Sequence, residues 1–350
     1  MRWIDMHCDT ISELEKRAGE SLHRNQLCVD VERLKRAGAK AQFFACFVNA
    51  ARYGEKTYED QMESGRSGKG RRRVVASAWD PAYESVLNMI SSARKAEDDS
   101  FVNAASEQDL DHAHMDGRIA GILTLEEGGV LNGKIERLEE LYEKGIRLVT
   151  LTWNYENCLG SPNSCDLEVM SRGLKPFGKE VVERMNDLGM LIDVSHLSDG
   201  GFWDCIKVSR FPIVASHSNA RALCPHPRNL TDEMLHALGN KGGVAGVNFY
   251  SAFLKKAGKR KAADTGNDRA GLMDIALHAA RILNQAGEDA LALGTDLDGF
   301  DRDSLPYGIW DVQDMEKVWE EMKRAGLTER QIEKAAYENV RRVIHEVWKG

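Results

Sequence analysis

The sequence lacks the features of a membrane-spanning or disulfide-stabilised chain. It has no run of eighteen apolar residues, so no segment is expected to cross a bilayer as a helix. Its seven cysteines include no CxxC pair, which indicates reduced thiols. The first residues carry charge and no cationic head followed by an apolar segment, so we expect no secretory signal peptide. These absences predict a cytoplasmic protein that makes no membrane contact.

An excess of positive charge is also missing. The chain has 47 basic and 55 acidic side chains, and its formal net charge of −8 argues against general affinity for nucleic acid. One basic stretch, GRSGKGRRR at residues 65–73, leaves open a non-catalytic barrel that binds nucleic acid or an acidic partner. With 350 residues, of which 42% are hydrophobic, the chain can bury a large core.

The pattern of apolar segments predicts the fold. Strand-length apolar segments, mostly continuous runs typical of a buried parallel sheet, occur at residues 3–7, 39–48, 119–126, 147–152, 190–196, 212–217, 243–249 and 290–296. Helical patterns separate them, and eight alternating strands predict an α/β fold, a (β/α)₈ TIM-type barrel spanning residues 1–350 as one domain. A doubly wound sheet is the rival, but the first strand lacks a following Gly-rich turn.

Three insertions interrupt this alternation, near residues 50–78, 154–175 and 251–268. Each is expected to follow the carboxyl end of a strand. In a barrel of this type, that face carries the active site.

Polar residues stand where the predicted strands end. They are His7 and Asp9, Glu126 and Glu127, His196, His217, and Asp296. Residues two apart on a strand point the same way, so His7 and Asp9 should reach one metal ion. His196 and His217 would serve a second, with a carboxylate from the glutamate pair as the bridge. Two such ions would hold a bridging hydroxide for hydrolysis of an amide, ester or phosphoester, and the chain has no GxSxG motif for a serine nucleophile.

Seven motifs, in this order and spacing, resemble the membrane (renal) dipeptidase family of zinc peptidases over nearly the full length. They are DMHCDT, LEEGG, LYEKGIRLVTLT, DVSHLS, ASHSNA, PRNLTDE and GTDLDG. The resemblance implies a (β/α)₈ barrel and two Zn²⁺ per chain. It also implies hydrolysis of small dipeptides, including those with a D-residue at the carboxyl end, by attack of a metal-bridging hydroxide.

Carried over onto this chain, the resemblance implies that His7, Asp9 and one glutamate hold the first zinc. The same glutamate would hold the second zinc together with His196 and His217. We choose Glu126 as this bridge, because the spacing from it through LYEKGIRLVTLT then needs no gap. The family's usual Glu-Gly-Gly would instead point to the next residue, so Glu127 stays an alternative.

The resemblance also implies residues that bind the substrate. Arg228 would bind the terminal carboxylate, for which the planar fork of arginine is suited. Asp296 would take the α-amino group or carry a proton to the leaving amine. Tyr250 matches a tyrosine of the substrate pocket. Mammalian members have a histidine directly after LTLT, where this chain has Trp153, so Asn154 or Tyr155 is a candidate substitute for binding the oxyanion.

Two further expectations follow from the resemblance. Because mammalian members are dimers, a homodimer is possible here. The chain ends in the charged stretch VRRVIHEVWKG, so we expect an unanchored member.

The main alternative function is another binuclear amidohydrolase, acting on a lactone, cyclic amide or phosphotriester. Such enzymes often carry His-x-His on the first strand and a carbamylated lysine as the bridge, and neither feature stands at these strand ends.

Overall fold

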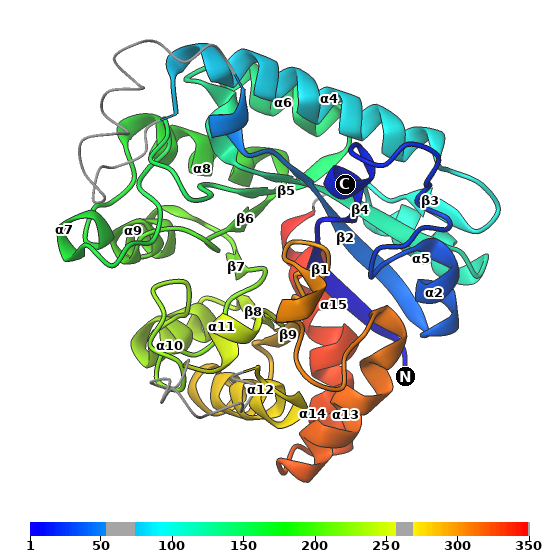
Figure 1. The fold of residues 1–350 in the computed structure, drawn as a ribbon. Coiled ribbons are helices and arrows are strands. Elements are labelled where there is room, and N and C mark those ends of the chain that lie inside the picture. The colour runs from blue at the N-terminus through cyan, green and yellow to red at the C-terminus, as the bar shows by residue number, and fades with distance from the viewer. Residues whose placement is uncertain (54–73, 257–268, 349–350) are drawn as a thin grey trace, which may run out of the picture.

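Eight parallel strands form a closed barrel in the computed structural model, which describes residues 1–53, 74–256 and 269–348 (Figure 1). Neighbours around the barrel follow the order β2-β1-β9-β8-β7-β6-β5-β4, and pairing of β2 with β4 closes it. The predicted (β/α)₈ barrel is therefore confirmed. The barrel strands are β1 (Trp3–Cys8), β2 (Ala39–Phe47), β4 (Ile119–Glu126), β5 (Ile146–Thr150), β6 (Leu191–Asp193), β7 (Val214–Ala215), β8 (Val244–Val247) and β9 (Leu291–Leu293).

Helices connect the strands and surround the barrel (Figure 1). They are α1 (Thr10–Leu14), α2 (Val31–Arg36), α4 (Trp79–Lys95), α5 (Glu107–Met115), α6 (Ile135–Glu143), α7 (Leu167–Met170), α8 (Pro176–Leu188), α9 (Asp199–Val208), α10 (Asp232–Asn240), α11 (Ser251–Leu254), α12 (Leu272–Ala286), α13 (Met315–Arg324), α14 (Glu329–Glu333) and α15 (Asn339–Val347). A π-helical turn, Lys334–Glu338, joins the last two. Within the described residues, no helix combines the length and apolar character needed to cross a membrane.

Local sequence signals explain where several helices begin and end. Thr231 caps α10, because its side chain accepts a hydrogen bond from the backbone N–H of Met234. Pro176 opens α8, and Gly189 ends it with a φ of +73° that glycine adopts without steric cost. Thr231, Pro176 and Gly189 are thus local signals for these helix boundaries.

The apolar core has two layers. The larger one lies between the strands and the outer helices. The smaller one combines residues from the first halves of the strands, such as Ile4, Phe43 and Ile122, with Val343 and Trp348 at the carboxyl end of the chain. Helix α15 therefore packs against the amino-terminal ends of the strands. The carboxyl ends, at the opposite mouth, are left for a functional site.

A short ninth strand was missed by the sequence prediction. β3 (Phe101–Asn103) pairs only with β4, along residues 119–121. Three residues are too few to show a periodic pattern, so this strand has no clear signal in the sequence.

Several predicted strands are too long. β6, β7 and β9 end at Asp193, Ala215 and Leu293, so the polar residues predicted at their tips lie in the following loops. His196 and Asp296 have φ values of +66° and +60°, a left-handed conformation that interrupts a strand. The argument that His7 and Asp9 point the same way because they lie two apart on one strand was also wrong. β1 ends at Cys8 and has a register irregularity between Asp5 and Cys8, so Asp9 lies just past the strand.

The three predicted insertions do follow barrel strands, namely β2, β5 and β8. Within the described residues, the second insertion carries the short helix α7 and the third begins with α11. The basic stretch at 65–73, with the nucleic-acid alternative that rests on it, lies outside the described residues.

The close packing of the strand ends generates a stability prediction. A Cβ atom at Gly294, directly after β9, would lie 1.7 Å from the backbone oxygen of Ser216. We expect Gly294→Ala to lower the free energy of unfolding by about 1–3 kcal/mol, because backbone must move to make room. Gly271→Ala is the matched control, since a Cβ there meets nothing within 4 Å. Unfolding in urea, followed by circular dichroism, measures both, and equal midpoints for the two variants would contradict the prediction.

Candidate metal centre

Five of the predicted side chains meet at the carboxyl end of the barrel. His7, Asp9 and Glu126 form one set of possible metal ligands, and Glu126, His196 and His217 form a second. In each set, one ligand atom per residue lies within 4.8 Å of the others, and all five residues are buried. The structure thus brings the predicted ligands together, and metal binding by them stays a prediction.

The carboxylate of Glu126 faces both sets at once. Its Oε2 lies 3.3 Å from Nε2 of His7, and Nε2 of His7 lies 3.3 Å from Oδ2 of Asp9. Its Oε1 lies 3.1 Å from Nε2 of His196 and 3.7 Å from Nε2 of His217. Because the two oxygens point to different partners, this side chain has the geometry of a bridging carboxylate.

The spacing of the donor atoms suits metal ions. Atoms bound about 2.0–2.1 Å from a tetrahedral ion lie about 3.3–3.4 Å apart. The distances above scatter around this value, and Nε2 of His196 lies 3.1 Å from Nε2 of His217. Both ring nitrogens of His7 are buried and make no hydrogen bond to the described part of the chain. Buried polar atoms normally have partners, so this imidazole fits a ligand supplied from outside the chain.

The clustered charges shift the pKa values of these groups. Burial opposes a charge on His7, but the carboxylates of Glu126 and Asp9 raise its pKa well above the ordinary value. Burial raises the pKa of Asp9 to about 6. For Glu126, burial is outweighed by His7 and His196, so its pKa lies well below its usual range. Burial lowers the pKa of His196 to about 4. A proton held on Nε2 of His7 would have to leave before a metal ion could bind there.

Asn154 supports His196 from behind. Its Oδ1 lies 3.2 Å from Nδ1 of His196, which directs Nε2 toward Glu126. Trp153 forms a wall beside them, with its ring centroid 4.9 Å from that of Phe47. The amide oxygen of Asn154 is therefore engaged with a predicted ligand, and its role toward an oxyanion stays a prediction.

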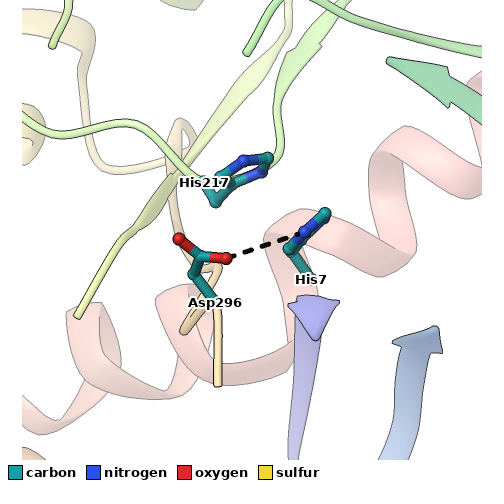
Figure 2. Close-up of side chains that lie close together, drawn as sticks. All are labelled: His7, His217 and Asp296. Atoms are coloured by element: carbon teal, nitrogen blue, oxygen red, sulfur yellow. Dashed lines mark ion pairs between the residues drawn. The ribbon is translucent and has the colours of Figure 1, made fainter. Parts of the chain in front are cut away.

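Asp296 lies beside this centre, facing His7 and His217 (Figure 2). Its Oδ1 is 3.8 Å from Nε2 of His7, and its Oδ2 accepts a hydrogen bond of 2.8 Å from Nδ2 of Asn248. Burial raises the pKa of Asp296 to about 7. Asn248 was not identified from the sequence, although its place two residues before Tyr250, near the end of the predicted strand at residues 243–249, was a usable signal.

Arg228 is a buried cation without a matching anion. Only 5% of its surface is exposed, and it makes no ion pair within the residues that the structure describes. Its guanidinium donates to Oγ of Ser218 and to the backbone oxygen of His217, each at 3.2 Å, while its buried Nε has no hydrogen-bond partner there. An incoming carboxylate would satisfy this group.

An aromatic-walled cavity of about 240 Å³ opens at the centre. Asp9, Glu126 and His196 reach it together with Asp296, and its walls include Phe47, Trp153, Tyr250, Phe253 and Phe300. A second cavity of about 430 Å³ shares Tyr250, Gly299 and Phe300 with it. Tyr250 thus lies at the junction of the two cavities.

Glu127, the alternative bridge, lies in a different network. Its φ is +90°, and its Oε1 accepts hydrogen bonds from the backbone N–H of Gly129 at 2.9 Å and from Nδ2 of Asn157 at 2.6 Å. It takes part in neither ligand set. The geometry therefore favours Glu126 as the shared carboxylate.

Metal binding is expected to release protons and to strengthen as pH rises. The carboxylates of Glu126 and Asp9 raise the pKa of His7 against the opposing effect of burial, and a proton on Nε2 would have to leave before this atom could bind a metal ion. We expect zinc titration calorimetry, in buffers of different ionisation enthalpy, to report release of about one proton from this residue. His7→Ala should release fewer protons than the unaltered protein. A zinc affinity that is the same at pH 6 and pH 8 would contradict this assignment.

Comparison with known proteins places the chain in a family. The family model described as membrane dipeptidase (peptidase family M19) matches residues 1–349. An uncharacterised Klebsiella pneumoniae protein from the region 5′ of pqqA is 36% identical over 249 residues, which are 69% of this chain and 88% of that protein. An uncharacterised dipeptidase of Schizosaccharomyces pombe is 34% identical over 232 residues, which are 65% of this chain and 53% of that protein.

Solved structures agree with this placement. A crystal structure of a metallopeptidase, dipeptidase AC, superposes with a TM-score of 0.82 at 25% identity, over 100% of this chain and 99% of that one. A Rhodobacter sphaeroides metallopeptidase, solved with a phosphinate mimic of the dipeptide L-Ala-D-Ala, shares the fold with a TM-score of 0.81 at 24% identity, over 99% of each chain. The chain therefore belongs to the membrane dipeptidase family, peptidase family M19, and is a metallo-dipeptidase.

Proposed function

We propose that this protein is a dipeptidase that works with two Zn²⁺ per chain. The observation that carries the proposal is the position of Glu126, whose two oxygens face two separate sets of imidazole and carboxylate donors. Nitrogen and oxygen donors of this kind are typical zinc ligands in hydrolases. When bound, the zinc pair would supply a water that is deprotonated near neutral pH and a Lewis acid for the substrate carbonyl.

Arg228 would bind the carboxyl terminus of the substrate. Its buried and unpaired guanidinium offers a fixed charge with parallel donors, which suits a carboxylate better than a flexible lysine does. Because the Rhodobacter sphaeroides metallopeptidase was solved with a mimic of L-Ala-D-Ala, we extend the proposal to dipeptides with a D-residue at the carboxyl end.

Asp296 would serve the amine end of the reaction. Without metal, burial raises its pKa to about 7, and its position beside the ligand sets would let its carboxyl group exchange a proton with the reacting groups. We assign it proton transfer to the leaving amine and, when ionised, contact with the substrate's α-amino group. Asn248 engages Oδ2, while Oδ1 lies on the side of the ligand sets, 3.8 Å from Nε2 of His7.

The cavity restricts the size of the substrate. About 240 Å³ is below the usual range of about 300–1,000 Å³ for pockets that hold drug-sized ligands. A dipeptide therefore suits the space directly at the ligand sets, whereas a longer substrate would have to reach into the adjoining cavity of about 430 Å³. The cytoplasmic location and the possible homodimer stay predictions.

Removal of two imidazoles tests the metal assignment. In a His196→Ala/His217→Ala variant one ligand set keeps only Glu126, so we expect hydrolysis of L,L- and L,D-dipeptides to fall by at least about 10³-fold after zinc is restored to chelated protein. His236→Ala, an exposed residue on α10, is the control and should keep full activity. Full activity in the double variant would disprove this mechanism. Turnover of lactones or phosphotriesters, but not of dipeptides, would favour the other binuclear amidohydrolases.

Substrate amidation tests Arg228. If it binds the terminal carboxylate, the unaltered enzyme should prefer a free dipeptide over its carboxamide by about 10–150-fold in kcat/KM, the range of a charged hydrogen bond. Arg228→Met should lose most of this preference, chiefly through a higher KM for the free dipeptide. Arg210→Met, on an exposed arginine, should retain the preference. An equal preference in the enzyme and in Arg228→Met would rule out this role.

A further inference from the structure

A buried carboxylate without a role so far lies two hydrogen bonds away from His217. Asp193, the last residue of β6, has no exposed surface. Its Oδ1 accepts from the backbone N–H groups of Ser195 at 3.0 Å and Ser216 at 2.8 Å. Its Oδ2 accepts from the hydroxyl groups of Thr150 at 2.7 Å and Ser216 at 2.6 Å. Four donors around one carboxylate leave it acting only as an acceptor.

This arrangement sets the direction of the next hydrogen bond. The hydroxyl of Ser216 has one proton and gives it to Asp193, so toward His217 it can only accept. The 2.7 Å contact between Oγ of Ser216 and Nδ1 of His217 therefore places the imidazole proton on Nδ1. The lone pair of Nε2 is left facing Nε2 of His196 at 3.1 Å and Oε1 of Glu126 at 3.7 Å.

The hydrogen bonds that lead from Asp193 through Ser216 to His217 form a relay. His217 depends on this relay more than His196 depends on its own hydrogen-bond partner. The partner of His196 is the side-chain amide of Asn154, which can present either its oxygen or its NH₂ group after a half-turn. The partner of His217 has no such freedom, because Asp193 consumes the serine proton. Figure 2 shows the ring of His217 facing His7, and the two ring centroids lie 3.8 Å apart. By holding His217, the relay thus also fixes the ring that stacks against His7.

We propose that Asp193 is a positioning residue for the metal centre. Through Ser216 it holds His217 in the tautomer that carries its proton on Nδ1 and aims Nε2 at the metal. Outer partners of ligating histidines fix tautomer and ring orientation in this way. The metal itself rests on the proposed function, whereas the tautomer is a property of the chain alone.

The substitution Asp193→Asn should reverse the direction of the hydrogen bonds in the relay while an amide side chain still fills the position of the carboxylate. The new amide would keep its oxygen for the two backbone donors but would place an NH₂ group where Oδ2 was. That group donates to Ser216, which must then donate its own proton to Nδ1 of His217. The imidazole proton moves to Nε2, where it blocks metal binding. The two side chains are nearly the same size, so packing is expected to be kept.

Two measurements on the full-length chain test this proposal. The first is ¹⁵N NMR of histidine-labelled, chelated protein, with the His217 signals assigned by their loss in His217→Ala. Nδ1 of His217 should be protonated in the unaltered protein, and Nε2 should be protonated in Asp193→Asn. The second is zinc affinity by chelator competition. One of the two zinc sites in Asp193→Asn should weaken by about 10–100-fold.

Thr150→Val is the matched control. It removes another donor to the same carboxylate oxygen but leaves the direction of the Ser216 bond unchanged. Its tautomer and zinc affinities should equal those of the unaltered protein. If Thr150→Val weakens zinc binding as much as Asp193→Asn does, the carboxylate has only a packing role and the proposal is overturned.

Other outcomes are also decisive. A proton on Nε2 of His217 in the unaltered protein overturns the proposal, as does an unchanged tautomer in Asp193→Asn. If Asp193→Asn does not fold, Ser216→Ala is tested in its place. Ser216→Ala removes the oxygen that accepts from Nδ1 of His217, so it should weaken one zinc site. Unchanged zinc affinity in Ser216→Ala would then count against the relay. Failure of the unaltered protein to bind zinc would refute the proposed function, while the tautomer measurement would still decide the relay.

Discussion

The site depends on one buried carboxylate shared between two groups of side chains. Glu126 ends β4, the strand that closes the barrel against β2, and only 3% of its surface is exposed. A buried charge is costly unless it is paired, and here imidazoles lie near both of its oxygens. Those imidazoles come from the carboxyl ends of three different strands, β1, β6 and β7. They can surround the carboxylate of Glu126 only because the barrel closes. In this way the closure of the sheet and the chemistry of the site support each other.

Unusual backbone conformations occur in the loops that follow β6 and β9, near this carboxylate. His196, Asp296 and Asp298 have positive φ values, which cost non-glycine residues roughly 1–3 kcal/mol each. Asp298 helps to hold its turn, because its carboxylate accepts hydrogen bonds from Oγ1 of Thr10 and the backbone N–H of Cys28, both at 2.6 Å. The strain at these three residues lies in the loops that follow β6 and β9, where hydrogen bonds such as those of Asp298 maintain it.

Much of the fold was predictable because buried parallel strands leave long apolar runs and helices leave periodic ones. All eight barrel strands were identified in this way. The short β3 was missed, and the ends of β6, β7 and β9 were placed too far along the chain. The residues around His196 and His217 are compatible with a strand by composition, and only their left-handed turns or loop geometry show that the strand has ended.

The sequence by itself determined which residue types stand at the exits of the strands and in what order, because a barrel strand repeatedly delivers its last residues to one face. That was enough to select His7, His196, His217 and the adjacent pair Glu126 and Glu127 as a group. Only the tertiary structure shows that Glu126 faces both sets of donors and that Glu127 does not, since adjacent residues differ in direction rather than in chemistry. The tertiary structure alone also linked Asp193 to His217, because hydrogen bonds between neighbouring strand ends have no fixed spacing along the chain.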